Sequence, residues 1–311
     1  MSAAVLFGSF FVLLLLTVPI GYAIGISSLI AIYYFSDIPL IIIAQKSITG
    51  VDSFPLLAIP FFMLAGNLMS SGGIARRLVN FFDALIGHVT GGLGMVTIIV
   101  CMFFAAISGS AVATVSAVGA FMIPEMVDHG YNKPFSAALT AAAGTIGVII
   151  PPSIPFVIYG VVSGTSITDM FTAGFMPGIM MGAALMIVCY FVSKKNGYRG
   201  KEKASSAKEI WVAFKDAFWA ILSPVIILGG IYSGFFTPTE AAVISVVYSF
   251  IVGVFVYKEL DVRGAYKSFK DAIVVNGATT FMVGFSTVFA AFLTMAQIPN
   301  MIAQAILGLT D

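Results

Sequence analysis

Long apolar runs with very few charged residues recur along almost the whole chain, from residue 4 to residue 309. A helix that crosses the hydrocarbon core of a bilayer needs about 20 apolar residues. Only 9% of the residues are charged, so the sequence predicts an all-α polytopic membrane protein. The apolar segments run over about 4–35, 54–71, 92–107, 111–127, 134–150, 153–164, 171–193, 217–235, 238–257 and 276–296.

The first apolar segment is ambiguous. Residues 4–35 are interrupted by Pro19 and Gly21, so they form either one long tilted helix or two short crossings broken at "TVPIG". Cys101 and Cys189 both fall inside apolar runs, where a cysteine usually packs as a small buried side chain. No metal site or disulfide framework is therefore expected.

Lysine and arginine predict the orientation, because they gather on the cytoplasmic side of a membrane. Residues 193–216 form the only extended polar segment and carry seven of these residues, so we expect this segment in the cytoplasm. If residues 92–127 enter the membrane and return to the same side, nearly all the other basic residues also lie inside. A single crossing there would put the basic stretch 72–90 outside. Residues 72–92 and 260–273 are amphipathic, and each is expected to lie flat in the headgroup region.

The stretch "FFAAISGSAVATVSAVGAFMIPEM" (103–126) contains the first candidate site. Ser108-Gly109-Ser110 lies between two apolar segments of about 15 residues, each short for a span. A hairpin that enters only part of the membrane needs a tight tip of small residues. Such a tip offers carbonyl and hydroxyl oxygens, which suit an alkali cation. The alternative is an ordinary span whose small residues serve helix packing.

The stretch "GTIGVIIPPSIP" (144–155) contains the second candidate site. Two adjacent prolines inside an apolar run break the helical hydrogen-bond ladder. Irregular backbone at membrane depth is tolerated only where it lines a cavity or is covered by protein. Freed carbonyls before the break favour a cation, and N–H groups at the start of the next helix favour an anion. The hairpin tip and the broken helix together suggest a site for Na⁺ and a carboxylate. The alternative is a proline kink that serves packing alone.

Other polar residues have simpler interpretations. Glu240 lies in "FFTPTEAA" (235–242), where Thr237-Pro238-Thr239-Glu240 is a capping box with proline at the first helical position. We favour this helix-start role over a functional intramembrane acid. An intramembrane serine protease using Ser110 would need a histidine at membrane depth. His88 and His129 flank the membrane segments, so the chain is not expected to be an enzyme.

The two halves of the chain resemble each other. Residues 17–35 align with 236–254, which places Pro19 over Pro238, and residues 67–78 resemble 293–306. With the predicted orientation, the first amphipathic stretch lies inside and the second outside. This is the pattern of an inverted repeat, which many secondary transporters contain. It also favours two crossings in residues 4–35.

Four stretches together resemble the large membrane subunit (DctM-like) of TRAP (tripartite ATP-independent periplasmic) transporters. They are "ISGSAVATVSAVGAFMIPEM", "GYNKPFSAALTAAAGTIGVIIPPSIPFVIYG", "PLLAIPFFMLAGNLM" and "GFFTPTEAA", and the resemblance covers essentially the whole chain. It implies an inverted-repeat, elevator-type fold and sodium-driven import of organic acids such as C4-dicarboxylates, 2-oxo acids, sialic acid or sugar acids. It also implies a small membrane subunit, a periplasmic substrate-binding protein and a bacterial inner-membrane location. Sodium is then the coupling ion, and no other cofactor is expected.

The resemblance also suggests which residues form the site. The candidate sodium ligands are Ser108, Gly109, Ser110, Gly144, Thr145, Gly147 and Ile150. The candidate substrate contacts are Ser110, Thr114, Pro152 and Ser153.

The implied domain organisation alternates scaffold and transport segments. Scaffold helices are expected in 1–71 and 217–296, and the transport core in 91–170. The remaining segments are an amphipathic arm (72–90), a membrane helix (171–193), a cytoplasmic linker (194–216) and a second arm (297–311).

One departure from the family concerns its second hairpin and second broken helix. Residues after 153 contain no PP pair and no second small-residue hairpin. We therefore expect a truncated chain, or one whose missing half belongs to another polypeptide, and we expect that it does not transport alone. The alternatives to a sodium-driven transporter are a permease subunit of another transporter class and a passive channel.

Overall fold

The computed structural model describes residues 2–36, 38–201 and 203–307. Within these ranges all regular secondary structure is helical, which confirms the all-α fold class. The chain divides into two compact units, one formed by Met1–Ser53 with Val274–Asp311 and the other by Phe54–Ile273.

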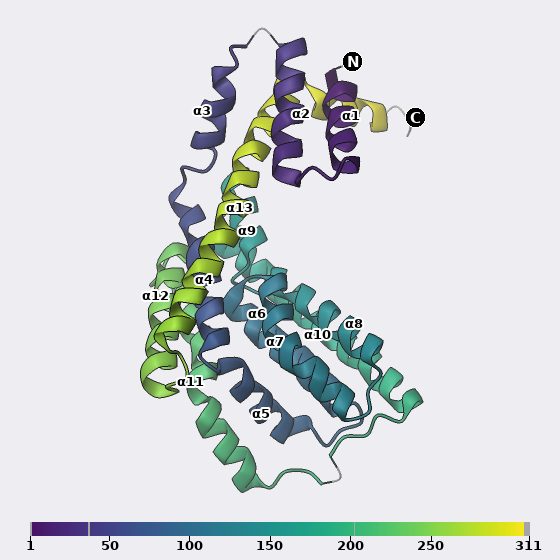
Figure 1. The fold of residues 1–311 in the computed structure, drawn as a ribbon, viewed down its shortest axis with the longest axis vertical. Helices are drawn as coiled ribbons and strands as arrows, with labels where there is room; N and C mark the ends of the chain where they lie inside the picture. Colours follow the sequence, from purple (N-terminus) through teal and green to yellow (C-terminus); the bar gives the residue numbers. More distant parts are fainter. Residues whose placement is uncertain (1, 37, 202, 308–311) are drawn as a thin grey trace. The chain divides into compact units, whose positions relative to one another are not determined.

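The first unit is built around two short apolar helices and the end of a long one. Helices α1 and α2 pack side by side (Figure 1). Their buried core includes Leu6 and Ile32, which cluster with Val288 and Phe292 of α13. The helices of this unit are α1 (Ser2–Leu15), α2 (Ile20–Phe35), α3 (Ile41–Thr49), the second part of α13 (Val262–Met295) and α14 (Ile298–Leu307).

The ambiguity in residues 4–35 is resolved as two helices. α1 ends at Leu15, and Pro19 occupies the N-cap position of α2. Thr17 in the connection has a positive φ of 62°, a backbone conformation that a helix does not adopt. Helix α3 is an element that the sequence analysis did not predict.

The second unit contains the predicted hairpin and broken helix. Its elements are η1 (Phe54–Leu57), α4 (Ala58–Ser71), α5 (Ile74–Ile86), α6 (Gly92–Ser108), α7 (Ala111–Asp128), α8 (Lys133–Thr145), η2 (Ile146–Val148), α9 (Ile154–Ser163), α10 (Ile167–Asn196), α11 (Ala207–Tyr232), α12 (Pro238–Ile251), the π-helical turn η3 (Val252–Val256) and the first part of α13.

Helix α6 lies at the centre of this unit. It contacts α4, α5, α7, α8, α10 and α11. A helix that is apolar on every side is stable only when it is surrounded. Accordingly, Val96, Ile98, Cys101, Phe104 and Ile107 are all fully buried.

Helix α5 is the predicted amphipathic arm. Ile74, Ala75 and Leu78 are buried, whereas Arg76 and Asn80 are exposed. The helix packs on α6 and α11 through its apolar face. The amphipathic prediction is therefore confirmed for this segment.

Six helical segments are long and apolar enough to cross a membrane, judged by length and composition within the described residues. This agrees with a multi-pass membrane protein. One expectation was wrong. The second helix of the hairpin, α7, was expected to be too short to cross a membrane, but it has 18 residues and is one of the six candidate spans. The first helix, α6, has 17 residues and is not among them. The candidate spans are Phe54–Ser71, Ala111–Asp128, Ile167–Asn196, Ala207–Tyr232, Pro238–Val256 and Val262–Met295.

Two predicted boundaries also differ from the structure. The amphipathic stretch 260–273 and the segment 276–296 form one continuous helix, α13. Asn276-Gly277 contains no proline, and an isolated glycine does not end a helix. Helix α11 begins at Ala207, ten residues before the predicted start at 217, because Ser206 and Glu209 form a capping box there.

The second compact unit groups residues from several of the expected segments, because it is defined by contacts. Residues 54–71 and 217–273, expected in the scaffold, belong to the same unit as the hairpin. The physical reason is that α4 packs on α12 and also contacts α6 and α9. Helix α10 starts at Ile167, inside the segment 91–170.

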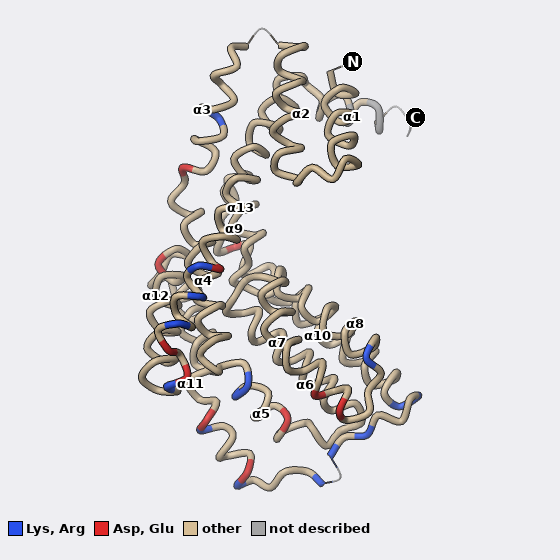
Figure 2. The backbone as a smooth tube through the Cα atoms, viewed as in Figure 1, with Lys and Arg blue, Asp and Glu red and all other residues tan. Residues whose placement is uncertain are grey.

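Charged residues are unevenly spread over the second unit. Figure 2 shows almost none along α6 and most of α7. They gather instead around α5, the first turns of α11, the first part of α13 and the connections at the helix ends.

Candidate functional site

The turn between α6 and α7 is only two residues long. Gly109 has a φ of +63°, which an L side chain rarely adopts, and Ser110 is the N-cap of α7. A Cβ at Gly109 would lie 2.8 Å from the carbonyl oxygen of Pro152. Only glycine therefore allows both this turn and this close approach. The predicted helical hairpin is confirmed as a pair of helices.

The predicted break in the next helix is also present. α8 ends at Thr145, a 3-10 turn follows, and α9 begins at Ile154. Ser153 bridges the break, because its hydroxyl donates to the carbonyl of Val148 over 2.6 Å and accepts from the N–H of Phe156 over 3.4 Å. The second bond makes Ser153 the N-cap of α9.

The hairpin tip and the break meet. The N–H of Ile154 donates to the carbonyl oxygen of Gly109 over 3.2 Å. Gly147 also lies against the tip, since a Cβ there would be 3.1 Å from Thr114 Oγ1 and 3.2 Å from the carbonyl oxygen of Ser110. The two segments that the sequence analysis expected to act together thus lie in direct contact.

Hydroxyl groups cluster inside this tip. The Ser108 and Thr114 hydroxyl oxygens are 3.2 Å apart, and both residues are fully buried. Thr114 donates to the carbonyl of Ser110 over 2.8 Å. The Ser110 hydroxyl accepts from the N–H of Ala113 over 3.3 Å and so caps α7.

Seven of the predicted site residues come together at this junction: Ser108, Gly109, Ser110, Thr114, Gly147, Pro152 and Ser153. Gly144 lies one turn away against α7, because a Cβ there would overlap Cγ2 of Val115.

Two predicted sodium ligands have side chains directed elsewhere. The Thr145 side chain is exposed, and its hydroxyl donates to the carbonyl of Ala142 in its own helix over 2.7 Å. The buried Ile150 side chain packs against Gly178 of α10.

Sequence reasoning missed Gly66 of α4. A Cβ at this position would lie 2.7 Å from Cβ of Ser108, so α4 covers the end of α6. Small residues allow helices to approach this closely in membranes. The only sequence signal was a single glycine in the apolar stretch "MLAGNLM".

The polar atoms at the junction are hydroxyl and carbonyl oxygens together with the N-terminal N–H groups of α7 and α9. Oxygen-only ligands suit a hard cation rather than a transition metal. Helix N-termini favour a negatively charged group. Among the described residues there is no group of three or more His, Cys, Asp or Glu that could hold a metal ion. The arrangement therefore suits an alkali cation and an anion.

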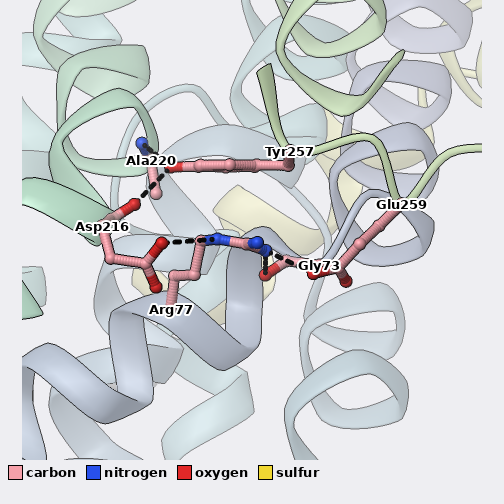
Figure 3. Close-up of polar contacts among 6 residues, drawn as sticks. All are labelled: Gly73, Arg77, Asp216, Ala220, Tyr257 and Glu259. Carbon is pink, nitrogen blue, oxygen red and sulfur yellow. Dashed lines mark hydrogen bonds and ion pairs between the residues drawn. The ribbon is translucent and has the colours of Figure 1, made fainter. Parts of the chain in front are cut away.

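A second polar cluster surrounds Arg77 of α5 (Figure 3). Its Nε lies 3.2 Å from Oδ1 of Asp216, and its Nη1 lies 2.7 Å from Oε1 of Glu259. Nη1 also donates to the carbonyl of Gly73 over 3.1 Å. The guanidinium stacks 3.8 Å from the centre of the Tyr257 ring.

Tyr257 extends this cluster into the backbone of α11. Its hydroxyl accepts from the N–H of Ala220 over 3.1 Å and donates to the carbonyl of Asp216 over 3.0 Å (Figure 3). Burial raises the pKa of Tyr257 to about 12, although the Ala220 N–H and the Arg77 charge lower it. The hydroxyl therefore keeps its proton at neutral pH. The cluster joins α5, α11 and the end of η3.

Glu240 has the predicted capping role. Its Oε2 accepts from the N–H of Thr237 over 2.8 Å, and its own N–H donates to the Thr237 hydroxyl over 3.3 Å. Cys101 and Cys189 are free thiols, and their predicted burial is confirmed.

Comparison with known proteins adds a decisive observation to this geometry. The sequence model of the DctM component of tripartite ATP-independent periplasmic transporters matches residues 7–311. The chain belongs to the DctM family. Members of this family are transporter permeases, so the chain is not an enzyme.

Individual members of the DctM family match nearly the whole chain. The isethionate TRAP transporter permease protein DctMQ of Oleidesulfovibrio alaskensis is 46% identical over 98% of this chain and 48% of that protein. The C4-dicarboxylate TRAP transporter large permease protein DctM of Rhodobacter capsulatus is 37% identical over 98% of this chain and 72% of that protein. The sialic acid TRAP transporter large permease protein SiaM of Vibrio cholerae is 42% identical over 96% of this chain and 70% of that protein. The chain thus spans about half the length of the first relative and about 70% of the other two.

Proposed function

We propose that this chain is the membrane part of a sodium-coupled secondary transporter that imports an organic acid. The names of the three relatives refer to isethionate, C4-dicarboxylates and sialic acid, all of which are organic anions. Membership of the DctM family argues against a permease of another transporter class. A passive channel is the remaining alternative.

The junction between the hairpin tip and the broken helix carries this proposal. Carbonyl and hydroxyl oxygens of Ser108, Ser110 and Thr114 form the cation side, with the backbone around Gly147 beside them. The N-terminus of α7, next to Ser110, forms the anion side. Because the two sides share one hydrogen-bonded junction, binding of sodium favours the arrangement that binds the acid. By the same linkage, binding of the acid raises the affinity of the site for sodium.

The proposed transporter has further components. The family is described as one component of a tripartite periplasmic transporter. Two of the relatives are called large permease proteins, which indicates a smaller membrane partner in those transporters. We therefore include a periplasmic substrate-binding protein and a small membrane subunit as partners. The bacterial inner membrane is the location that fits these partners and the six candidate spans.

Uptake measurements test the proposal. Vesicles containing this chain, the second hairpin and broken helix that the resemblance implies, and the small subunit would be supplied with the binding protein and a labelled organic acid. We expect uptake with an inward sodium gradient and none with an equal potassium gradient. A passive channel would let the acid equilibrate without either gradient, and that result would overturn the proposal. Ser110→Ala should raise the sodium concentration for half-maximal uptake, whereas Ser163→Ala, at the exposed end of α9, should not.

A further inference from the structure

The first turns of α11 have an exposed face that is basic and aromatic. Lys208, Trp211, Val212 and Lys215 follow the spacing of one helical face. Trp211 is 56% exposed and Val212 is 59% exposed. The ammonium group of Lys215 lies 5.4 Å from the centre of the Trp211 ring. Both lysine side chains are exposed.

The positive charges of this face are not neutralised by nearby acids. Within the described part of the chain, neither Lys208 nor Lys215 forms an ion pair. The carboxylate of Asp216 is bound to Arg77 (Figure 3). The carboxylate of Glu209 accepts from the N–H of Ser206 over 2.7 Å, where it caps α11. The two neighbouring carboxylates therefore have other partners.

The length of α11 places this face at the membrane surface. The helix has 26 residues and is a candidate span. At about 1.5 Å per residue it is roughly 39 Å long, whereas the hydrocarbon core is about 30 Å thick. All the charged residues of α11 lie near its beginning, so its first one or two turns are the end that extends into the headgroup layer. Tryptophan is typical of this depth, and lysine side chains reach outward from it.

A surface cavity adjoins the same turns. It has a volume of about 550 Å³ and is lined by Asn80 of α5 and by Lys208, Glu209, Val212, Ala213 and Asp216 of α11. Val212 and Ala213 are apolar, whereas the Asn80 amide and the Lys208 ammonium are hydrogen-bond donors. The Glu209 and Asp216 carboxylates in the lining repel a phosphate, so the phosphate is placed at the Lys208 edge of the cavity and the glycerol against the apolar wall.

We propose that the first turns of α11 bind the headgroup of an anionic phospholipid. Lys208 and Lys215 contact the phosphate, Trp211 packs against the glycerol region, and the acyl chains follow the apolar exposed face of α11. Charge complementarity and depth both favour a lipid over a soluble partner. Nothing in this proposal depends on the transported substrate.

Fluorescence of Trp211 tests the proposal directly. The chain has two tryptophans, so Trp219→Phe leaves Trp211 as the only one. This variant of the full chain would be reconstituted in bilayers with brominated phosphatidylglycerol or brominated phosphatidylcholine, whose bromine atoms quench nearby tryptophan. Each lysine near a surface favours an anionic lipid about fivefold. We expect the anionic lipid to bind next to Trp211 at least about fivefold more tightly than the zwitterionic lipid.

Charge variants in the same background show whether the two lysines are responsible. In the double variant Lys208→Gln/Lys215→Gln, the ratio of anionic to zwitterionic lipid affinity next to Trp211 should fall close to one. The control Lys133→Gln with Lys267→Gln removes the same net charge from exposed positions elsewhere and should retain the preference. Equal quenching by both lipids without the charge changes would overturn the proposal. So would a preference that persists in the Lys208/Lys215 variant or is lost equally in the control.

Discussion

The carbonyl oxygen of Gly109 accepts a hydrogen bond from the N–H of Ile154 over 3.2 Å. This bond joins the turn of the α6–α7 hairpin to the first residue of α9. It satisfies an N–H in the first turn of a helix, where no partner within the helix exists. The two irregular segments therefore stabilise each other, and a change in one is expected to be felt in the other.

Gly109→Ala should weaken this junction more than an ordinary glycine replacement. A left-handed backbone costs a non-glycine residue about 1–2 kcal/mol, and the new Cβ would also lie 2.8 Å from the Pro152 carbonyl. Gly164→Ala is the matched control, because Gly164 has a φ of +71° with no atom within 4 Å of the added Cβ. We expect a larger drop in thermal unfolding temperature for Gly109→Ala, measured on the purified chain in detergent. Equal drops would contradict the close approach to Pro152.

Ser153→Ala should lower the free energy of unfolding by more than the loss of a helix N-cap alone would. Removing an N-cap hydroxyl costs about 1 kcal/mol. Ser153 is also fully buried and donates to Val148 across the break, and an unpaired buried carbonyl adds about 1–3 kcal/mol. Ser166→Ala is the control, since Ser166 caps α10 in an exposed position through a bond from Asp169. Ser153→Thr should retain most of the stability. The measurement is again thermal unfolding, and similar losses for both alanine variants would argue against the bridge.

The sequence predicted the junction well because its signals are properties of single residues. Gly109 permits a turn that other residues disfavour, and Pro151-Pro152 cannot continue a helix. The contact of Gly66 with Ser108 was not predictable, because it depends on how α4 packs against α6. The direction of the Ile150 side chain towards Gly178 depends in the same way on the position of α10.

Helix boundaries were predicted less well, because apolar content was used in place of backbone chemistry. The Ser206–Glu209 capping box starts α11 within a segment that looked like a polar linker. Gly277 looked like a division between two elements, but a long helix tolerates one glycine. The capping box at Glu240 was predicted correctly from the same kind of signal.

Glu240→Gln should leave sodium-dependent uptake in the proposed transporter nearly unchanged. Glutamine retains an oxygen that can accept the bond from the Thr237 N–H, so the capping box survives. Glu240→Ala removes the oxygen and should lower the unfolding temperature. Loss of uptake in the glutamine variant with unchanged stability would instead indicate an acid that acts in transport.

Arg77→Lys should destabilise the α5–α11 contact. Lysine keeps the charge, but it cannot reach Asp216, Glu259 and the Gly73 carbonyl with the planar geometry of arginine. Both acids are partly exposed, so we expect a modest cost in unfolding free energy of about 0.5–1 kcal/mol. Arg76→Lys is the control, because Arg76 is the exposed neighbour in the same helix. Combining Arg77→Lys with Tyr257→Phe should cost less than the sum of the single changes, which a double-mutant cycle of unfolding free energies measures.

In the first unit, two glycines should respond to alanine in opposite directions. A Cβ at Gly25 would lie 2.7 Å from the Phe285 ring, and Gly25 is buried. The added methyl would overlap the near edge of this ring, so Gly25→Ala should cost about 1–3 kcal/mol of unfolding free energy. Gly8 lies inside α1 with no atom within 4 Å of an added Cβ. Gly8→Ala should therefore stabilise the chain by roughly 0.5–1 kcal/mol, since alanine loses less conformational freedom in a helix. Thermal unfolding should therefore show a lower unfolding temperature for Gly25→Ala and a higher one for Gly8→Ala than for the unchanged chain. Stabilisation by Gly25→Ala would mean that α2 and α13 are not packed as closely as the structure shows.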